Sequence, residues 1–418
     1  MARLWGGEVH EPMKATDDTA MLTPPEAWAG VPPDFSLVLG GPLYQLLLRT
    51  RMARPPLDLL HRRMAILALV AWLPLLALSV LEGHALGTGV AVPFLHDVEA
   101  HVRFLVALPL LVLAEMVVHA RIRPVAGQFL GRGLISGEAR PRFAAIVASV
   151  MRLRNSVALE VFLVVFVYTV GLYVWRQQHV PLAATWFASA TDSGLRLTWA
   201  GSWYAWVSIP IFQFLLLRWY FRLFLWTRFL WQVSRLELRI VPTHPDRAGG
   251  LGFLAGSPAA FAPVLVAQSA LLAGAIAGRI FFERAALPDF KQEIAGAVVI
   301  LVLLVLAPLF LFMGHLIHAR RRGLAEYGAL ASRYVMDFDR KWVRGGAPAD
   351  EPLMGSADIQ SLADLGNSFE VIRGMRPFPF GREAVIQIVV TVALPFLPLL
   401  LTMFPLEELL TKLVKVLL

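Results

Sequence analysis

The sequence predicts an all-α polytopic membrane protein, a bundle of about seven spans with helical extensions on the cytoplasmic side. Of its 418 residues, 57% are hydrophobic and only 16% are charged, whereas an average soluble domain carries about 25% charged residues. The mean hydropathy of +0.63 points the same way. Apolar stretches of roughly 20 residues with almost no charge recur along the chain, as membrane helices require.

The first 61 residues form a polar N-terminal region that ends in a short apolar stretch. Residues 1–34 are polar and rich in proline, and they lack the apolar core of a signal peptide. Residues 35–48 are apolar but are interrupted by Gly40, Gly41 and Pro42, and they are too short to cross a bilayer. We therefore expect an interfacial segment here.

Residues 62–318 are expected to hold the first six spans, and residues 385–418 a seventh span followed by an amphipathic helix. The expected spans are, in chain order, residues 64–81, 104–120, 156–175, 204–217, 258–282, 294–317 and 385–404. Pro395 and Pro398 leave open a re-entrant seventh segment instead of a full crossing.

The distribution of basic residues predicts the orientation of the bundle. With a cytoplasmic N-terminus, 30 of the 38 Lys and Arg residues fall on the inner side. Cytoplasmic loops collect Lys and Arg, so this orientation is the expected one, and seven full spans then place the C-terminus outside. Because topology explains the net charge of +8, nucleic acid is not an expected partner.

Two spans look longer than the bilayer requires. Basic and aromatic sequence continues the fourth span from Arg218 to Arg239, and residues 141–156 lead into the third span. We expect both extensions to be helical and to form a cytoplasmic stalk. Its arginines would reach toward anionic lipid head groups beside a belt of Trp and Tyr.

The fifth span carries signals for its start and its packing. Ser257 is expected to cap the helix and Pro258 to occupy its first turn. Gly274 and Gly278 form a small-xxx-small pair, which favours close packing against another helix.

Residues 319–384 form the longest polar stretch, and we expect a cytoplasmic helical segment. Two helices are predicted, over residues 324–342 and 356–374, joined by a loop at Gly345. About 65 residues bury little core alone, so we expect this segment to pack on the stalk.

The loop at residues 241–252, with the sequence Val-Pro-Thr-His-Pro-Asp-Arg-Ala-Gly-Gly-Leu-Gly, is the most distinctive stretch. Its candidate functional residues are His244, Asp246, Arg247, Gly249 and Gly250. The glycines could present backbone amides to an anion near Arg247. The alternative is a rigid turn between the stalk and the fifth span.

This loop, together with the Ser-Ala-Asp-Ile-Gln-Ser-Leu-Ala-Asp-Leu-Gly-Asn-Ser-Phe-Glu stretch from Ser356 and the Pro-Leu-Leu-Leu-Thr-Met-Phe-Pro-Leu-Glu-Glu run ending at Glu408, resembles a family of uncharacterised bacterial integral membrane proteins. The resemblance covers roughly the second half of the chain. It implies a multi-pass protein of the bacterial inner membrane and no particular reaction.

Ionisable residues inside spans are costly, and by default they mark functional sites. Near the cytoplasmic ends of the spans, we expect a polar site or proton relay with candidates Glu115, Glu160, His315, Gln213 and Gln268. The same region could form a divalent-metal site whose ligands would be Glu115, His119, Glu160, His315 and His318.

Three functions remain open at this point. The first is a transporter or channel for an ion or small solute, and the second is a membrane-embedded metalloenzyme acting on a lipid or quinone. The third is a non-catalytic scaffold of the envelope, and a homo-oligomer is compatible with each. The chain has no Cys, which excludes thiolate metal sites and cysteine nucleophiles. It also lacks the Gly-x-Ser-x-Gly motif of many hydrolases, which weakens a hydrolase interpretation.

Overall fold

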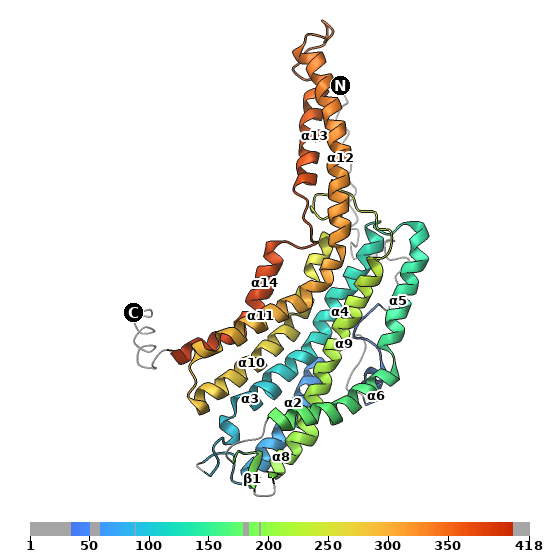
Figure 1. Cartoon of the computed structure of the whole chain (residues 1–418). Coiled ribbons are helices and arrows are strands. Elements are labelled where there is room, and N and C mark those ends of the chain that lie inside the picture. Colours follow the sequence, from blue (N-terminus) through green and yellow to red (C-terminus); the bar gives the residue numbers. More distant parts are fainter. Residues whose placement is uncertain (1–34, 51–58, 88, 179–183, 192–193, 404–418) are drawn as a thin grey trace, which may run out of the picture.

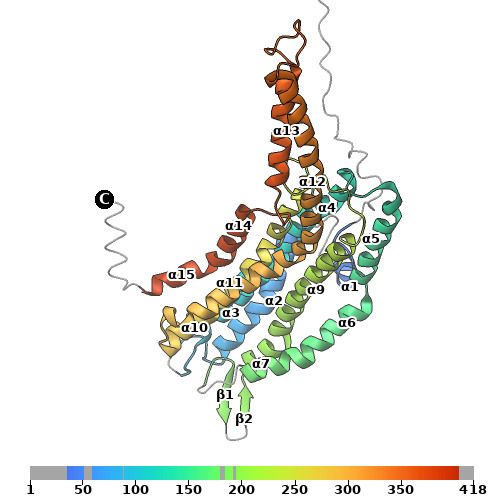
Figure 2. The same ribbon diagram turned by 45° about the horizontal axis from the view of Figure 1, so that its top comes forward.

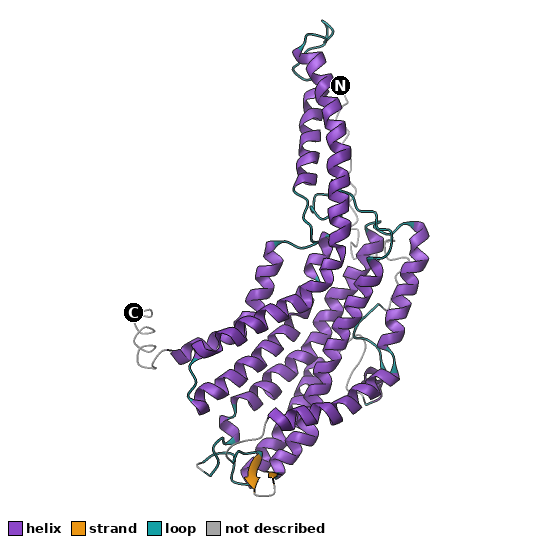
Figure 3. Cartoon of the chain, in the orientation of Figure 1, coloured by secondary structure: helices purple, strands orange, loops and turns teal. Residues whose placement is uncertain are grey.

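A computed structural model describes residues 35–50, 59–87, 89–178, 184–191 and 194–403. The described chain is mainly helical with almost no strand (Figure 3), and it contains seven helices long and apolar enough to cross a membrane. The all-α class and the seven spans are therefore confirmed, and the protein is a multi-pass integral membrane protein. The spans are Leu60–Leu81, Val98–Gly131, Val157–Gln177, Trp199–Val233, Gly252–Glu283, Leu287–Val343 and Arg382–Met403.

Helices α2 (Leu60–Leu81), α4 (Leu108–Gly131), α9 (Ile209–Val233) and α10 (Ala262–Glu283) form the centre of the bundle. Helix α4 contacts each of the other three (Figure 1). This central position explains why α4 buries residues on a wide face, whereas α2 buries a single narrow stripe.

The outer helices complete the bundle. They are α5 (Arg140–Arg154), α6 (Val157–Phe166), α7 (Leu172–Gln178), α11 (Lys291–Leu306), α14 (Arg382–Ala393) and α15 (Leu397–Leu400). Helix α5 packs on α9, and α14 packs on α10 and α11. The seventh span stays helical, with a 3₁₀ turn at Leu394–Phe396 between α14 and α15, and it does not turn back within the described residues (Figure 2).

The second, third and fourth spans each contain a π-helical turn, at Val102–Ala107, Val167–Gly171 and Tyr204–Ser208. The first turn joins α3 (Val98–His101) to α4, the second joins α6 to α7, and the third joins α8 (Trp199–Trp203) to α9. Two short antiparallel strands, β1 (Ala188–Thr191) and β2 (Gly194–Leu197), mark one end of the bundle, which we call the sheet end.

The opposite end, which we call the hairpin end, carries two antiparallel helices that project beyond the bundle (Figure 1). They are α12 (Met313–Phe338), extended by a π-helical turn at Asp339–Val343, and α13 (Ala357–Arg373). Both helices were expected from the sequence. The expected packing on the stalk is limited to their base, where Ala319, Arg322 and Glu326 border a cavity together with Arg239. Beyond it the expectation was wrong, because the two helices pair with each other and project away from α5 and α9.

An aromatic cluster fills the core near the hairpin end. The Phe129 ring lies 5.1 Å from that of Phe253, 6.1 Å from Phe229 and 6.2 Å from Phe312. Phe35 joins the cluster at 5.2 Å from Phe229 and is fully buried. Residues 35–38 therefore enter the bundle, and the expectation of an interfacial segment over residues 35–48 was wrong for this part. Helix α1 (Pro42–Arg49) follows, and its described side chains are half-buried or exposed.

Apolar side chains also cover the outside of the bundle. Leu69 and Leu73 on α2, and Val161 and Phe162 on α6, are all about half exposed. In water, a patch of this extent would be an aggregation hazard, whereas in a bilayer it meets lipid chains.

Two local expectations for the fourth and fifth spans need correction. Helix α9 ends at Val233 rather than Arg239, and residues beyond it run as a loop in which Leu238 pairs with Ile135. Ser257 does not cap a helix, because its hydroxyl donates to the Leu254 carbonyl at 2.8 Å. Pro258 does occupy the first turn, as expected.

Of the Gly274 and Gly278 pair, only Gly274 makes a close approach. A Cβ built on Gly274 would lie 3.2 Å from Val102, whereas nothing lies within 4 Å of one on Gly278. The amphipathic helix expected over residues 406–418 lies outside the described residues, as do residues 1–34.

Candidate functional site

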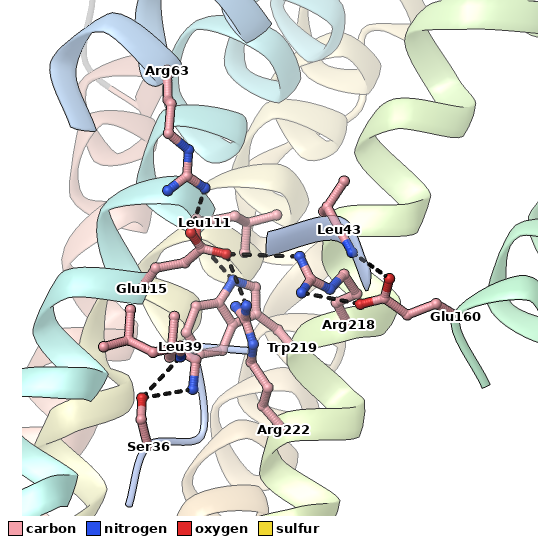
Figure 4. A network of polar contacts seen from close by, with 11 residues as sticks. Ser36, Leu39, Leu43, Arg63, Leu111, Glu115, Glu160, Arg218, Trp219 and Arg222 are labelled. Carbon is pink, nitrogen blue, oxygen red and sulfur yellow. Dashed lines mark hydrogen bonds and ion pairs between the residues drawn. The ribbon is translucent and has the colours of Figure 1, made fainter. Parts of the chain in front are cut away.

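Glu115 lies at the centre of a network of buried charges between α2, α4, α6 and α9 (Figure 4). Its Oε1 atom accepts a hydrogen bond from Arg222 Nη2 at 2.8 Å, and Arg218 Nη1 lies 3.9 Å from the same oxygen. Its Oε2 atom is paired with Arg63. Three guanidinium groups therefore surround a carboxylate whose side chain is only 5% exposed.

Each of these charges lies on the inward face of its helix. Glu115 shares the buried face of α4 with Leu108, Leu111 and Val118, at the spacing of three to four residues that defines one helix face. Arg63 is in phase with the buried stripe of α2, which continues at Ala71, Leu75 and Ser79 at multiples of four residues. On α9, Arg218 and Arg222 are one turn apart and alternate with the buried Leu215 and Trp219.

Arg218 extends the network to a second carboxylate, because its Nη2 lies 3.3 Å from Glu160 Oε1 on α6. The other Glu160 oxygen accepts the backbone amide of Leu43 at 2.7 Å, in the first turn of α1. A carboxylate at this position satisfies an amide that has no partner within the helix. Glu160 thereby ties the N-terminal segment to the network.

Trp219 lies beside the ion pairs on α9. Its indole Nε1 donates to the Leu111 carbonyl at 2.8 Å, and its ring lies 4.5 Å from the Arg222 guanidinium carbon. Trp219 is 1% exposed, so it removes water from one side of the network. The contact between ring and guanidinium also offsets part of the cost of burying the cation.

The network contains more hydrogen-bond donors than the residues around it satisfy. Arg63 is 2% exposed, yet its Nε and Nη1 atoms have no hydrogen-bond partner among the described residues. The described network also has three guanidinium groups against two carboxylates, a net positive charge at ordinary protonation. A buried, unpartnered donor is costly, so an anion is the kind of ligand that this site would favour.

The space beside the network is small in this conformation. A cavity of about 10 Å³ is lined by Leu37, Gly40, Glu160, Arg218 and Arg222, among others. This volume is about that of one water-sized probe. Residues 35–41 therefore close the network on the side that Leu37 and Gly40 line.

His119 fixes the same segment one turn after Glu115. Its Nδ1 atom lies 2.9 Å from the Ser36 hydroxyl, which also accepts the amides of Val38 at 3.1 Å and Leu39 at 2.9 Å. With both lone pairs of Ser36 occupied, its proton points to His119, whose Nδ1 must accept. His119 therefore holds the N-terminal segment in place through Ser36.

The five metal-ligand candidates do not form the expected site. His315 donates from Nε2 to the Ser234 carbonyl at 2.7 Å, and His318 is exposed at the edge of another cavity, of about 740 Å³. Glu115 and Glu160 face arginines instead. Across the part of the chain that the structure describes, no group of three or more His, Asp or Glu side chains could hold a metal ion.

The two glutamines proposed for a polar path bond to neighbouring helices. Gln213 donates to the Gly171 carbonyl at 3.2 Å, and Gln268 donates to the Tyr220 hydroxyl at 2.7 Å. Such bonds join α9 to the third span and α10 to α9.

The loop at residues 241–252 is a tight turn centred on Asp246. The Asp246 carboxylate accepts the amides of Ala248 at 2.8 Å, Gly250 at 3.1 Å and Gly252 at 2.8 Å, and it pairs with His244 Nδ1 at 2.9 Å. Gly249 and Gly250 have positive φ values of 62° and 96°, which glycine adopts without strain. The Gly250 and Gly252 amides, which were expected to face an external anion, thus donate to Asp246 instead, and for these two amides the expectation was wrong.

The sequence interpretation missed three residues of the network: Arg63, Arg218 and Arg222. Arg63 was counted only among the basic residues that indicate the orientation of the bundle. Arg218 and Arg222 were expected to reach lipid head groups, whereas their exposed fractions are only 7% and 4%. Two signals were available. Glu115 inside a span needs a nearby cation, and each arginine is in phase with an inward-facing helix stripe.

The fold and this network define a multi-pass integral membrane protein with buried charges between its helices. No protein-family model, no curated protein and no solved structure matches the chain. The argument for function therefore rests on the geometry of the site.

Proposed function

We propose that the protein is a transport protein for a small anion, with the network around Glu115 as its polar site. The observation that carries this proposal is Arg63, whose buried Nε and Nη1 atoms lack hydrogen-bond partners among the described residues. A purely structural bundle gains little from such a group, because well-packed apolar residues often stabilise a core as well as a buried ion pair does.

The charge of the site supports an anion as the transported species. Glu115 and Glu160 offset two of the three guanidinium groups, so an anion entering beside Arg63 would bring the described charges into balance. Intramembrane charges that pair with one another commonly mark ion pathways.

Transport through this site requires a conformational change. The cavity of about 10 Å³ is too small for a hydrated ion, and residues 35–41 cover it. Two glycines in this segment, Gly40 and Gly41, have positive φ values of 138° and 88°. We propose that the segment moves about these glycines to open the site.

We infer that the hairpin end faces the cytoplasm of a bacterial cell and that the protein resides in the inner membrane. The support is the excess of Lys and Arg in the segments at this end, together with the family resemblance of the second half of the chain. Because the chain has no Cys, a single-cysteine variant at Met354, which is 89% exposed in the hairpin loop, tests the orientation with an impermeant maleimide.

Flux measurements test the transport proposal. The purified protein in proteoliposomes is expected to conduct chloride and to exclude potassium. Arg63→Gln removes the open donors and leaves Glu115 paired with Arg222, so we expect anion flux to fall at least about tenfold, the equivalent of one charge-assisted hydrogen bond. Glu293→Gln is the matched control, because Glu293 forms an exposed pair with Arg279.

Absence of flux for every tested ion in folded wild-type protein would overturn the proposal. A second variant addresses the moving segment. Leu37 is 1% exposed, so Leu37→Cys should react with a maleimide faster when the transported anion is present, and an unchanged rate would contradict opening of residues 35–41.

The scaffold function is favoured by one separate observation. The projecting α12–α13 hairpin exposes Leu330, Val335, Met336 and Ile359, between 44% and 58% each. Exposed apolar residues on a projecting hairpin suit a protein partner. Deletion of the hairpin with retention of flux would separate this role from transport.

A further inference from the structure

Another polar cavity lies at the hairpin end, outside the network around Glu115 and distinct from the cavity beside His318. It has a volume of about 590 Å³, and its lining includes Arg132, Asp246, Arg247, Phe253 and Arg376. These residues come from four places in the chain: the end of α4, the loop at residues 241–252, the 3₁₀ turn at Gly252–Gly256 that holds Phe253, and the connection between α13 and α14.

Three arginines border this cavity without carboxylate partners among the described residues. Arg132 lies over the Phe253 ring, 5.1 Å from its centroid, and is otherwise exposed. Arg247 is exposed and passes beside Gly374, where a built Cβ would lie 3.5 Å from its Cδ and Nε atoms. Neither guanidinium takes part in an ion pair within the described chain.

Arg376 is held more firmly than the other two. Its Nη2 donates to the Asp246 carbonyl at 2.7 Å, and its amide donates to the Arg247 carbonyl at 2.8 Å. Its Nε atom is buried without a hydrogen-bond partner among the described residues. A fixed guanidinium with an unused donor at the edge of a cavity is arranged to bind an oxyanion.

The one carboxylate in the cavity does not neutralise these arginines. Asp246 directs its oxygens to the amides of Ala248, Gly250 and Gly252 and to His244. Its charge is therefore offset within its own loop. The cavity retains an excess of positive charge that the loop does not cancel.

We propose that this cavity, bordered by Arg132, Arg247 and Arg376, is a binding site for a phosphoryl group. The planar guanidinium matches two oxygens of a phosphate at once, which is why arginine predominates at such sites. A phosphate bound here would link the end of α4 to the base of the hairpin. The group can come from free phosphate or from the head group of an anionic phospholipid.

The experiment has two arms that distinguish these sources. In phosphate-free detergent, titration calorimetry measures the binding of inorganic phosphate to the full-length protein. In nanodiscs of phosphatidylcholine with and without phosphatidylglycerol, native mass spectrometry measures the phosphatidylglycerol that the protein retains. Both arms compare wild type with Arg132→Gln, Arg247→Gln and the double variant. The control is Arg142→Gln, an exposed arginine on α5 that does not border the cavity.

We expect binding in at least one arm, about tenfold weaker in each single variant and undetectable in the double variant. Arg142→Gln should bind as wild type does. Binding of inorganic phosphate identifies a free anion as ligand, and retention of phosphatidylglycerol alone identifies a lipid head group. No binding in either arm, or equal binding by the double variant, would overturn the proposal.

Arg132 and Arg247 are exposed, so their replacement should leave the fold intact, and thermal unfolding checks this. If the double variant does not fold, Arg247→Lys serves instead, because it keeps the charge and loses the paired donors. Anion flux is not measured in this experiment, so the phosphoryl site and the transport proposal can fail independently.

Discussion

Arg222 on α9 donates a hydrogen bond of 2.8 Å to Glu115 on α4, and each of the two side chains is only 5% exposed. The two residues are 107 positions apart in the sequence, so the bond joins the second span to the fourth. Because Arg63 and Arg218 approach the same carboxylate, loss of Glu115 would leave three buried cations close to one another.

Glu115→Gln should therefore destabilise the protein strongly. Breaking a buried ion pair by removing one partner costs about 3–5 kcal/mol, since the remaining charge stays buried without compensation. Chemical denaturation in detergent measures the change in the free energy of unfolding. The exposed pair of Glu293 and Arg279 provides the control, because Glu293→Gln should cost less than about 1 kcal/mol. Similar losses for the two variants would contradict the central role of Glu115.

A pair of glycines tests the packing of the spans. A Cβ on Gly201 would lie 1.8 Å from the Phe187 carbonyl oxygen, so Gly201→Ala must shift backbone and should cost at least about 1–3 kcal/mol. Gly278 has nothing within 4 Å of a built Cβ, so Gly278→Ala should be neutral or stabilise α10 by up to about 1 kcal/mol. Thermal unfolding of both variants checks the contrast, and a larger loss for Gly278→Ala would refute it.

The loop at residues 241–252 should give the protein a specific sensitivity to acid. Burial raises the pKa of Asp246, but the amides of Ala248, Gly252 and Gly250 outweigh it and hold the pKa below its ordinary value of 3.8. A carboxylate with a depressed folded pKa stabilises the protein above its unfolded pKa, and this stabilisation is lost as the pH falls through the folded value. Asp246→Asn should therefore reduce stability at neutral pH by about 1–2 kcal/mol.

The same substitution should also flatten the decline in stability below a pH of about 4. Thermal midpoints recorded across this range measure both effects. Asp350→Asn is the control, because the Asp350 side chain is exposed in the loop between α12 and α13. An unchanged pH profile in Asp246→Asn would show that the amide contacts contribute nothing to stability.

Asp358 joins the two helices at the tip of the projecting hairpin. Its carboxylate accepts Lys341 Nζ at 2.8 Å and Trp342 Nε1 at 3.0 Å, and these contacts lower its pKa. Asp358→Ala should speed amide hydrogen exchange around residues 339–358, while exchange within the spans stays the same. Asp364→Ala, which removes only a contact with Gln360 on an exposed face, should leave the tip protected.

Much of the fold follows from the sequence because hydropathy in a membrane protein is a strong constraint. A span must satisfy its own backbone in lipid, so a run of apolar residues such as 64–81 can only be a helix. The helices over residues 324–342 and 356–374 were also correctly placed. Their mutual packing was not, because amphipathic patterning shows which face is apolar and not which neighbour covers it.

The candidate site was predictable only in part. Glu115 and Glu160 were identified because a carboxylate within a span is rare. Arg63 and Arg222 were not, because an arginine near the end of a span ordinarily reaches the head groups, and only tertiary packing turns it inward. The burial of Phe35 and Ser36 was missed for a similar reason: Gly40 and Gly41 end the apolar run, but they also let the chain turn into the bundle.

The hairpin also has a mechanical consequence. Helix α12 continues the sixth span through a 3₁₀ turn at Ala307–Phe312, which begins beside Pro308. Its 26 residues make a rigid arm of about 39 Å at 1.5 Å per residue. A tilt of about 10° at the proline joint would swing the free end by about 7 Å. A small tilt within the packed helices would therefore move the free end of the hairpin by several times the displacement at its base.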